Sequence, residues 1–321
     1  MPDKALTTAE VHSTHARYRQ QGNRSAMLSL VSDYLPESLP LEEERWARWE
    51  RVDSLALLGR CEEMIAVQKE DLAWATARLP PDALLRVMDD STQAACWLAA
   101  GRIEEWLTIF DTLMTDTIPT EGNRFERFYY LRTACHVLQE SDLQTEAFSI
   151  VSRMRALIAE DPDWVRAAEI EVQALDAEAR LFWSQQEVPR LRQAGLAATQ
   201  RLEQQFGLIH GLLNTSAEKQ SLQTGYDNIA ATLFRAAQYD LSIPLHRRCL
   251  ELGGRSEYVY LWLAAALWQT ERQRDETLAL LAQGASECWG SDYQQRFATL
   301  SEFAGVRSDP EFIAAVTREK H

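Results

Sequence analysis

A nine-residue phrase that occurs twice is the feature of this sequence that most restricts its fold. The segment LLGRCEEMI at residues 57–65 has a near-copy, AAGRIEEWL, at residues 99–107, which is 42 residues later. Both contain two small or apolar residues, Gly-Arg, one variable position, Glu-Glu and two apolar residues. Paired acids soon after a glycine suit the first turn of a helix, where negative charge complements the helix dipole. Each copy therefore predicts a tight turn between two helices.

The same turn pattern can be followed along most of the chain. The turn positions are Gly22, Gly59, Gly101, Asp142, Ser184, Ala237, Arg272 and Gly305. They are separated by 37, 42, 41, 42, 53, 35 and 33 residues. Unrelated amphipathic helices are not expected to keep a step of 41 or 42 residues three times in succession. One helix pair cannot bury its apolar face alone, so the pattern predicts a stack of helix–turn–helix repeats.

The composition agrees with a helical chain. Only 13 Gly and 10 Pro occur in 321 residues, too few for a protein built from many hairpin turns. Good helix formers such as alanine, leucine, glutamine, glutamate and arginine dominate, and alternating runs of β-branched residues are absent. The predicted fold class is all-α.

One unit, TGYDNIAATLFRAAQYDLSIPLHRRCLELGG at residues 224–254, resembles the tetratricopeptide (TPR) repeats. The residues that match the family's aromatic, aliphatic and small positions are Tyr226, Ile229, Ala230, Leu233 and Tyr239. The second helix departs from the family, with Ser242, His246 and Cys249 at its Ala, Phe and Ala positions and Gly254 in place of the closing proline.

The resemblance implies a right-handed superhelical array of helical hairpins. The N-terminal repeats, at about 42 residues, are longer than the roughly 34 residues of the TPR family, so HEAT-type repeats remain an alternative architecture. The 53-residue step predicts an additional short element that divides the array. We therefore expect an N-terminal block of long hairpins at 1–206 and a C-terminal TPR-like block at 207–321.

The resemblance also implies that the first helix of each repeat lines a concave groove that holds a peptide. Counting back from each turn gives the residues expected to face that groove, and Asn228 falls where the family often carries an asparagine that binds the ligand backbone. The predicted partner-binding residues are Asn228, Arg235, Asp227, Trp262, Gln269, Arg132, His136, Gln139, Trp49 and Asp53. Arginine can grip a carboxylate with two hydrogen bonds, and asparagine can pair with a peptide group.

No catalytic or phosphate-binding motif of the common kinds is present. We therefore expect a non-catalytic scaffold that binds a protein or peptide and needs no cofactor or metal. One concrete form is a bacterial regulator that responds to a peptide. The alternative is an enzyme, or an accessory subunit of one, built on a helical array with a closed pocket.

The net charge and the cysteines indicate which class of partner and which cellular compartment to expect. A formal net charge of −15 disfavours nucleic acid as a partner. The five cysteines are scattered inside apolar stretches, which predicts buried free thiols in a cytoplasmic protein. The longest apolar run, YLWLAAALW at 260–268, is much shorter than a membrane span, so no membrane association is expected.

Overall fold

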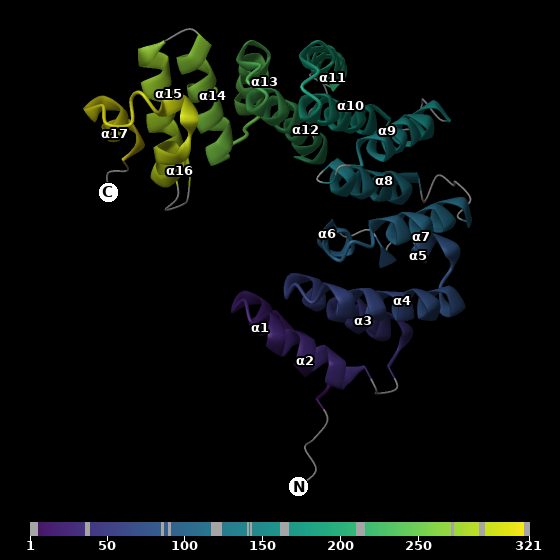
Figure 1. Ribbon diagram of the computed structural model, residues 1–321. Coiled ribbons are helices and arrows are strands. Elements are labelled where there is room, and N and C mark those ends of the chain that lie inside the picture. Colours follow the sequence, from purple (N-terminus) through teal and green to yellow (C-terminus); the bar gives the residue numbers. More distant parts are fainter. Residues whose placement is uncertain are drawn as a thin grey trace. The chain divides into compact units, whose positions relative to one another are not determined.

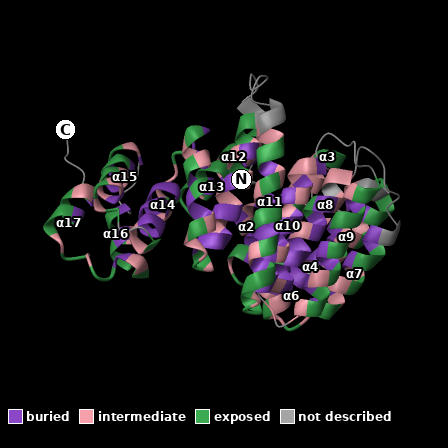
Figure 2. Ribbon diagram, turned by 90° about the horizontal axis from the view of Figure 1, so that it is seen from above, coloured by how far each residue is buried: buried purple, intermediate pink, exposed green. Residues whose placement is uncertain are grey.

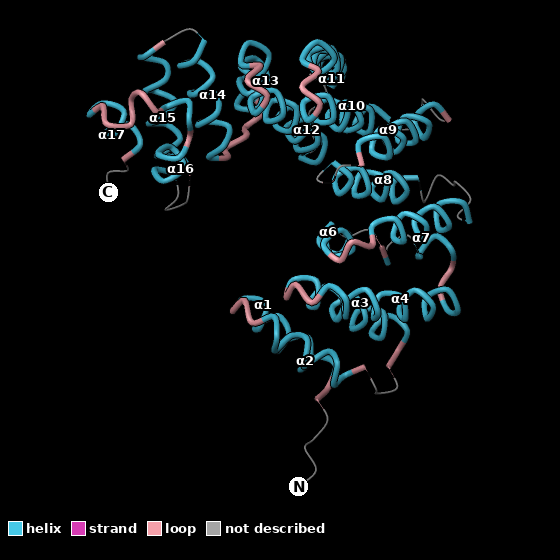
Figure 3. The backbone as a smooth tube through the Cα atoms, viewed as in Figure 1, coloured by secondary structure: helices cyan, strands magenta, loops and turns pink. Residues whose placement is uncertain are grey.

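The computed structural model describes residues 6–35, 39–84, 87–88, 91–116, 124–139, 141, 143–160, 167–209, 216–270, 273–288 and 293–317. Within these ranges all regular secondary structure is helical, and no strand occurs (Figure 3). The predicted all-α class is therefore confirmed. No helix in the same ranges has both the length and the apolar character needed to span a membrane.

The chain divides into two compact units, Met1–Arg153 (unit 1) and Met154–His321 (unit 2). The division falls within α9 (Gln144–Ala159). The repeat spacing predicts a boundary near residue 207. That position lies inside α11 (Val188–Ile209). The long step before Ala237 reflects the lengths of α11 and α12 (Ser216–Arg235), with 22 and 20 residues. The described residues of this stretch contain these two long helices and no additional short one.

Unit 1 is built from helices that pack on their neighbours in sequence. They are α1 (Thr8–Gln20), α2 (Arg24–Tyr34), α3 (Leu41–Leu57), α4 (Cys61–Arg78), α5 (Pro81–Leu84), α6 (Ser91–Ala99), α7 (Ile103–Asp116) and α8 (Arg124–Gln139). Contacts join α1 to α2, α2 to α3 and α3 to α4, and α6 packs against α3, α4 and α8 (Figure 1).

Unit 2 follows the same principle. Its remaining elements are α10 (Ala167–Ser184), α13 (Tyr239–Glu251), α14 (Glu257–Thr270), α15 (Arg274–Glu287), α16 (Tyr293–Thr299), η2 (Ser301–Phe303) and α17 (Pro310–Val316). The most extensive contacts are between α10 and α11, α12 and α13, α13 and α14, and α14 and α15. In Figure 2 the buried residues form stripes along the helices, as expected when each helix hides one face against its neighbours.

One turn geometry recurs at the C-terminal ends of six of the described helices. A residue with positive φ occurs at Gly22, Gly59, Gly101, Gln186, Ala237 and Gly253. At each, the N–H of that residue bonds to the carbonyl three residues earlier, and the next N–H bonds to the carbonyl five residues before it. This is the Schellman motif, which satisfies the last carbonyls of a helix and lets the chain turn back.

Four of the predicted turn positions, Gly22, Gly59, Gly101 and Ala237, lie at these left-handed residues. Ser184 ends α10, and the left-handed residue of that turn is Gln186, two positions later. Gly305 lies in a turn that follows η2. Asp142 and Arg272 lie outside the described residues.

Aromatic side chains fill the interior of unit 1. Phe110 stacks on Tyr130 with ring centroids 4.3 Å apart, and Trp106 packs beside both. Trp97 donates from Nε1 to Gln68 Oε1 over 2.7 Å, which satisfies a buried indole N–H. The hydrophobic core therefore runs through the helix interfaces.

The cysteines correct one prediction from the sequence. Cys61 at the start of α4 and Cys96 in α6 are joined by a disulfide, whereas free thiols were expected at all five positions. Because α6 packs on α4, the Cα atoms of Cys61 and Cys96 lie 4.9 Å apart, a distance typical of disulfides. Cys135, Cys249 and Cys288 are free and buried, as predicted.

Candidate functional site

A hollow in unit 2 contains two of the residues that the repeat pattern selects. We call it the arginine–tryptophan hollow, and its volume is about 430 Å³. It is lined by Trp183, Phe234, Arg235, Tyr258, Leu261, Trp262, Arg296, Thr299, Leu300, Ser301 and Glu302. These residues come from α10, α12, α14, α16 and η2 and from the chain around them.

The centre of the hollow is an aromatic stack with a guanidinium above it. The rings of Phe234 and Trp262 are nearly parallel, at 18°, with centroids 5.5 Å apart. Tyr258 precedes Trp262 by one helical turn on α14, and the centroids of their rings lie 4.9 Å apart. The guanidinium of Arg235 lies 5.3 Å from the centroid of the Trp262 ring. A cation over an indole face is an attractive arrangement that holds the arginine in place.

The two arginines of the hollow differ in their partners. Arg296 is paired with Glu257 at 2.6 Å and lies over the Tyr258 ring at 4.4 Å. Arg235 is exposed and forms no ion pair or hydrogen bond with any residue that the structure describes. Its guanidinium donors are therefore available to a ligand.

Glu302 accepts hydrogen bonds through both its side chain and its backbone. Its carboxylate accepts a hydrogen bond from Tyr239 Oη over 3.1 Å, and its backbone carbonyl accepts one from Gln269 Nε2 over 2.6 Å. Burial, together with the Glu302 charge, raises the pKa of Tyr239 to about 12. The phenol therefore stays protonated and donates to Glu302, which fixes this edge of the hollow.

A buried histidine lies behind the aromatic stack. His246 is fully buried, and its ring lies 6.1 Å from that of Trp262 and 6.5 Å from that of Phe234. Neither ring nitrogen has a hydrogen-bond partner among the described residues. Burial lowers the pKa of His246 to about 3, so the imidazole is neutral near pH 7 and acts as part of the apolar wall.

The other predicted residues of unit 2 lie near the hollow. Gln269 supports Glu302 as described above. Asn228 is half-buried on α12, seven residues before Arg235 and hence on the same helix face, but it does not line the hollow. Asp227 has one buried oxygen, Oδ1, without a partner among the described residues, and burial raises the pKa of its carboxyl.

The predicted residues on α3 of unit 1 differ from each other in exposure. Trp49 is 38% exposed and lines a separate pocket beside α3. Asp53 is only 8% exposed, so its expected place on an open groove is not supported. It lies close enough to His15 of α1 for their charges to interact. The cause is that α1 covers this side of α3, where Arg19 also pairs with Glu50 at 2.9 Å.

On α8 the three predicted residues sit in different surroundings. Arg132 lies over the ring of Tyr129, 4.1 Å from its centroid. His136 is exposed, and Gln139 donates to Cys135 Sγ over 3.5 Å. No described pocket gathers these three side chains together.

Several hollow residues escaped the sequence reasoning. Trp183 and Tyr258 are 40% and 38% exposed, which is unusual for large aromatic residues, and Arg296 comes from the short helix α16, which precedes the predicted turn at Gly305. Tyr258 could have been found, because it precedes Trp262 by one helical turn. Trp183 and Arg296 depend on how α10 and α16 pack, which residue type alone does not reveal.

Comparison with known proteins adds no assignment. No protein-family model matches the sequence, and no curated protein matches it.

Proposed function

We propose that the chain is a non-catalytic scaffold of TPR-like helical repeats that binds a peptide or protein partner in the arginine–tryptophan hollow. The recurring Schellman turns, with helices that pack on their sequence neighbours, support the repeat interpretation. The proposed architecture is a right-handed array, and the proposed setting is a cytoplasmic regulator.

The observation that carries the proposal is the pairing of Arg235 with Trp262. The indole supports the guanidinium from one side, and no described acid neutralises it. An unpaired arginine fixed on an aromatic surface is suited to a carboxylate ligand.

The surrounding residues define the rest of the ligand. The exposed rings of Trp183 and Tyr258, together with the half-buried ring of Trp262, offer contact area to an apolar or aromatic side chain. The favoured partner is therefore a peptide in which an acidic side chain, or a terminal carboxylate, lies beside an aromatic or aliphatic residue. Asn228, on the same face of α12, is placed to pair with the backbone of a peptide that extends along the helix.

We favour binding over catalysis because the titratable groups here have structural roles. Glu302 is held by Tyr239, and the neutral imidazole of His246 is buried behind the ring stack. Neither group offers an acid or a base directed into the hollow.

Peptide selection followed by variant binding tests the proposal. A random peptide library would be panned against the full chain, and selected peptides would be titrated by fluorescence anisotropy. We expect Arg235→Gln and Trp262→Ala each to weaken binding about tenfold, because each removes an anchoring contact. Asn228→Ala should weaken it less.

The control is Arg247→Gln. Arg247 is an exposed arginine on α13 that pairs with Glu276 at 2.8 Å and does not line the hollow. The Arg247→Gln variant should bind the selected peptides with the same affinity as the unmodified protein. Selected peptides without acidic residues, or equal affinities for Arg235→Gln and Arg247→Gln, would refute the proposal.

A further inference from the structure

A second pocket lies in unit 1, separate from the arginine–tryptophan hollow, and one residue predicted to bind a peptide, Trp49, lines it. It lies between α3 and α4 and the residues that follow α4, and its volume is about 430 Å³. We call it the α3–α4 pocket. It is lined by Glu42, Arg45, Trp46, Arg48, Trp49, Val52, Asp71, Trp74, Ala75, Leu79, Val87 and Gln93. This volume falls within the usual range of small-molecule sites, about 300–1,000 Å³.

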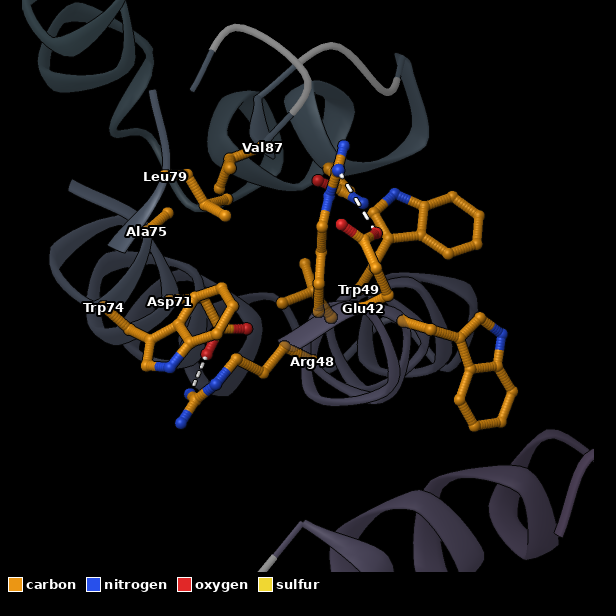
Figure 4. A pocket seen from close by; sticks show the side chains of 12 residues that line it. Glu42, Arg48, Trp49, Asp71, Trp74, Ala75, Leu79 and Val87 are labelled. Carbon is orange, nitrogen blue, oxygen red and sulfur yellow. Dashed lines mark hydrogen bonds and ion pairs between the residues drawn. The ribbon is translucent and has the colours of Figure 1, made fainter. Parts of the chain in front are cut away.

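Two helix stripes face each other across the pocket. Arg45, Trp49 and Val52 recur at helical spacing along α3, and Trp74 and Ala75 lie on α4. Figure 4 shows Leu79, Ala75 and Val87 gathered on one side of the space, with Trp49 and Glu42 across from them. The interior is therefore mainly aliphatic and aromatic, which suits the apolar body of a ligand.

Most charges at the pocket are already paired. Arg48 donates to Asp71 Oδ1 over 2.7 Å and to Glu44 over 2.9 Å, and Arg51 reaches the same Asp71 oxygen at 3.1 Å. Arg48 also covers the Trp74 ring, 4.8 Å from its centroid. These groups form a closed network at one wall, and they leave no free cation there.

Arg45 has a longer ion pair than Arg48 does. Its nearest described acid is Glu42, 3.7 Å away, and the side chain of Glu42 is 79% exposed. Arg45 forms no hydrogen bond with a described residue, and its own side chain is only 32% exposed. A half-buried guanidinium whose single described ion pair is long and exposed to water can exchange that partner for an anion in the pocket.

Two wall atoms also lack partners. Asp71 Oδ2 and Trp74 Nε1 are buried, and neither has a hydrogen-bond partner among the described residues. Leaving such atoms unsatisfied costs about 1–3 kcal/mol each.

We infer that the α3–α4 pocket binds a small amphipathic monoanion, with its carboxylate or sulfonate on Arg45 and its apolar body between Trp49, Ala75, Leu79 and Val87. This site is independent of the peptide site in the arginine–tryptophan hollow, because the two pockets share no lining residue.

A matched pair of fluorescent probes tests this assignment on the full chain. 1-Anilinonaphthalene-8-sulfonate carries the anionic group, and N-phenyl-1-naphthylamine is the same ring system without it. Both should bind saturably at one site. Arg45→Gln should weaken the sulfonate about tenfold and leave the neutral amine unchanged, because only the charged hydrogen bond is lost.

Filling the pocket should remove both probes. Leu79→Trp and Val87→Trp each place an indole in the space, and either variant suffices if the other fails to fold by circular dichroism. Trp262→Ala in unit 2 is the control and should bind both probes normally. Saturable binding that persists in the filled variants, an equal loss of both probes in Arg45→Gln, or a loss confined to Trp262→Ala would each overturn the assignment.

Discussion

Two residues carry a backbone conformation that their side chains disfavour. Ala237 and Gln186 have φ of 55° and 59°, close to the 66° to 69° of Gly22, Gly59 and Gly101 in equivalent turns. In the left-handed region a β-carbon approaches the following carbonyl oxygen, at a cost of roughly 1–2 kcal/mol. The cost is accepted because the Schellman hydrogen bonds and the packing of the two helices require the turn there.

Replacing Ala237 by glycine should therefore stabilise the protein. We expect Ala237→Gly to raise the free energy of unfolding by about 1 kcal/mol, measured by urea denaturation. The control is Ala231→Gly in the middle of α12, which should lower it by about 1 kcal/mol because glycine loses more backbone entropy in a helix. A decrease in both variants would show that the turn at Ala237 is not left-handed in solution.

At the scale of the helices, the disulfide makes a specific prediction. Cys61 and Cys96 are 35 residues apart, and closing a loop of that length stabilises a chain by about 4 kcal/mol in the chain-entropy estimate. Dithiothreitol should lower the melting temperature of the oxidised protein. The double variant Cys61→Ser, Cys96→Ser should not respond to the reductant, whereas Cys135→Ser should respond like the unmodified protein. Alkylation of all five cysteines in unreduced, denatured protein would contradict the bond.

The helical elements could be predicted because their ends have local causes. Gly59 and Gly101 occupy positions where positive φ is needed, so a search for glycine after an apolar stretch finds the turns. Gln186 could not be found in this way, because its conformation is imposed by the packing of α10 on α11 and not by its residue type. The disulfide was missed for a related reason. The approach of Cys61 to Cys96 depends on the packing of α6 on α4.

The candidate site was partly predictable. Counting from the turn selected Arg235 and Trp262, which lie together in the structure, because helical periodicity fixes which residues share a face. The same count placed Asp53 on an open surface, although α1 covers it. The count treats every predicted repeat alike, whereas α3 has α1 and α2 as neighbours on this side.

At the scale of the whole chain, the division into two units lies in an unexpected place. It falls within α9, which is a continuous helix with no loop at that point. The sequence pointed to residue 207 because the repeat step lengthens there. Compact units are defined by contacts between distant residues, which a change of step does not measure.

If the two units are separate cooperative bodies, a core defect in one should leave the other intact. Phe110 and Phe303 are both fully buried, one in each unit. Phe110→Leu and Phe303→Leu each remove part of an aromatic contact, and we expect each to cost about 1–2 kcal/mol. Hydrogen exchange followed by mass spectrometry should show faster exchange in α6 to α8 for Phe110→Leu and in α14 to α17 for Phe303→Leu. Each variant serves as the control for the other. Faster exchange through both units in either variant would mean that the chain opens as a single cooperative body, with α9 transmitting the loss of stability across the division.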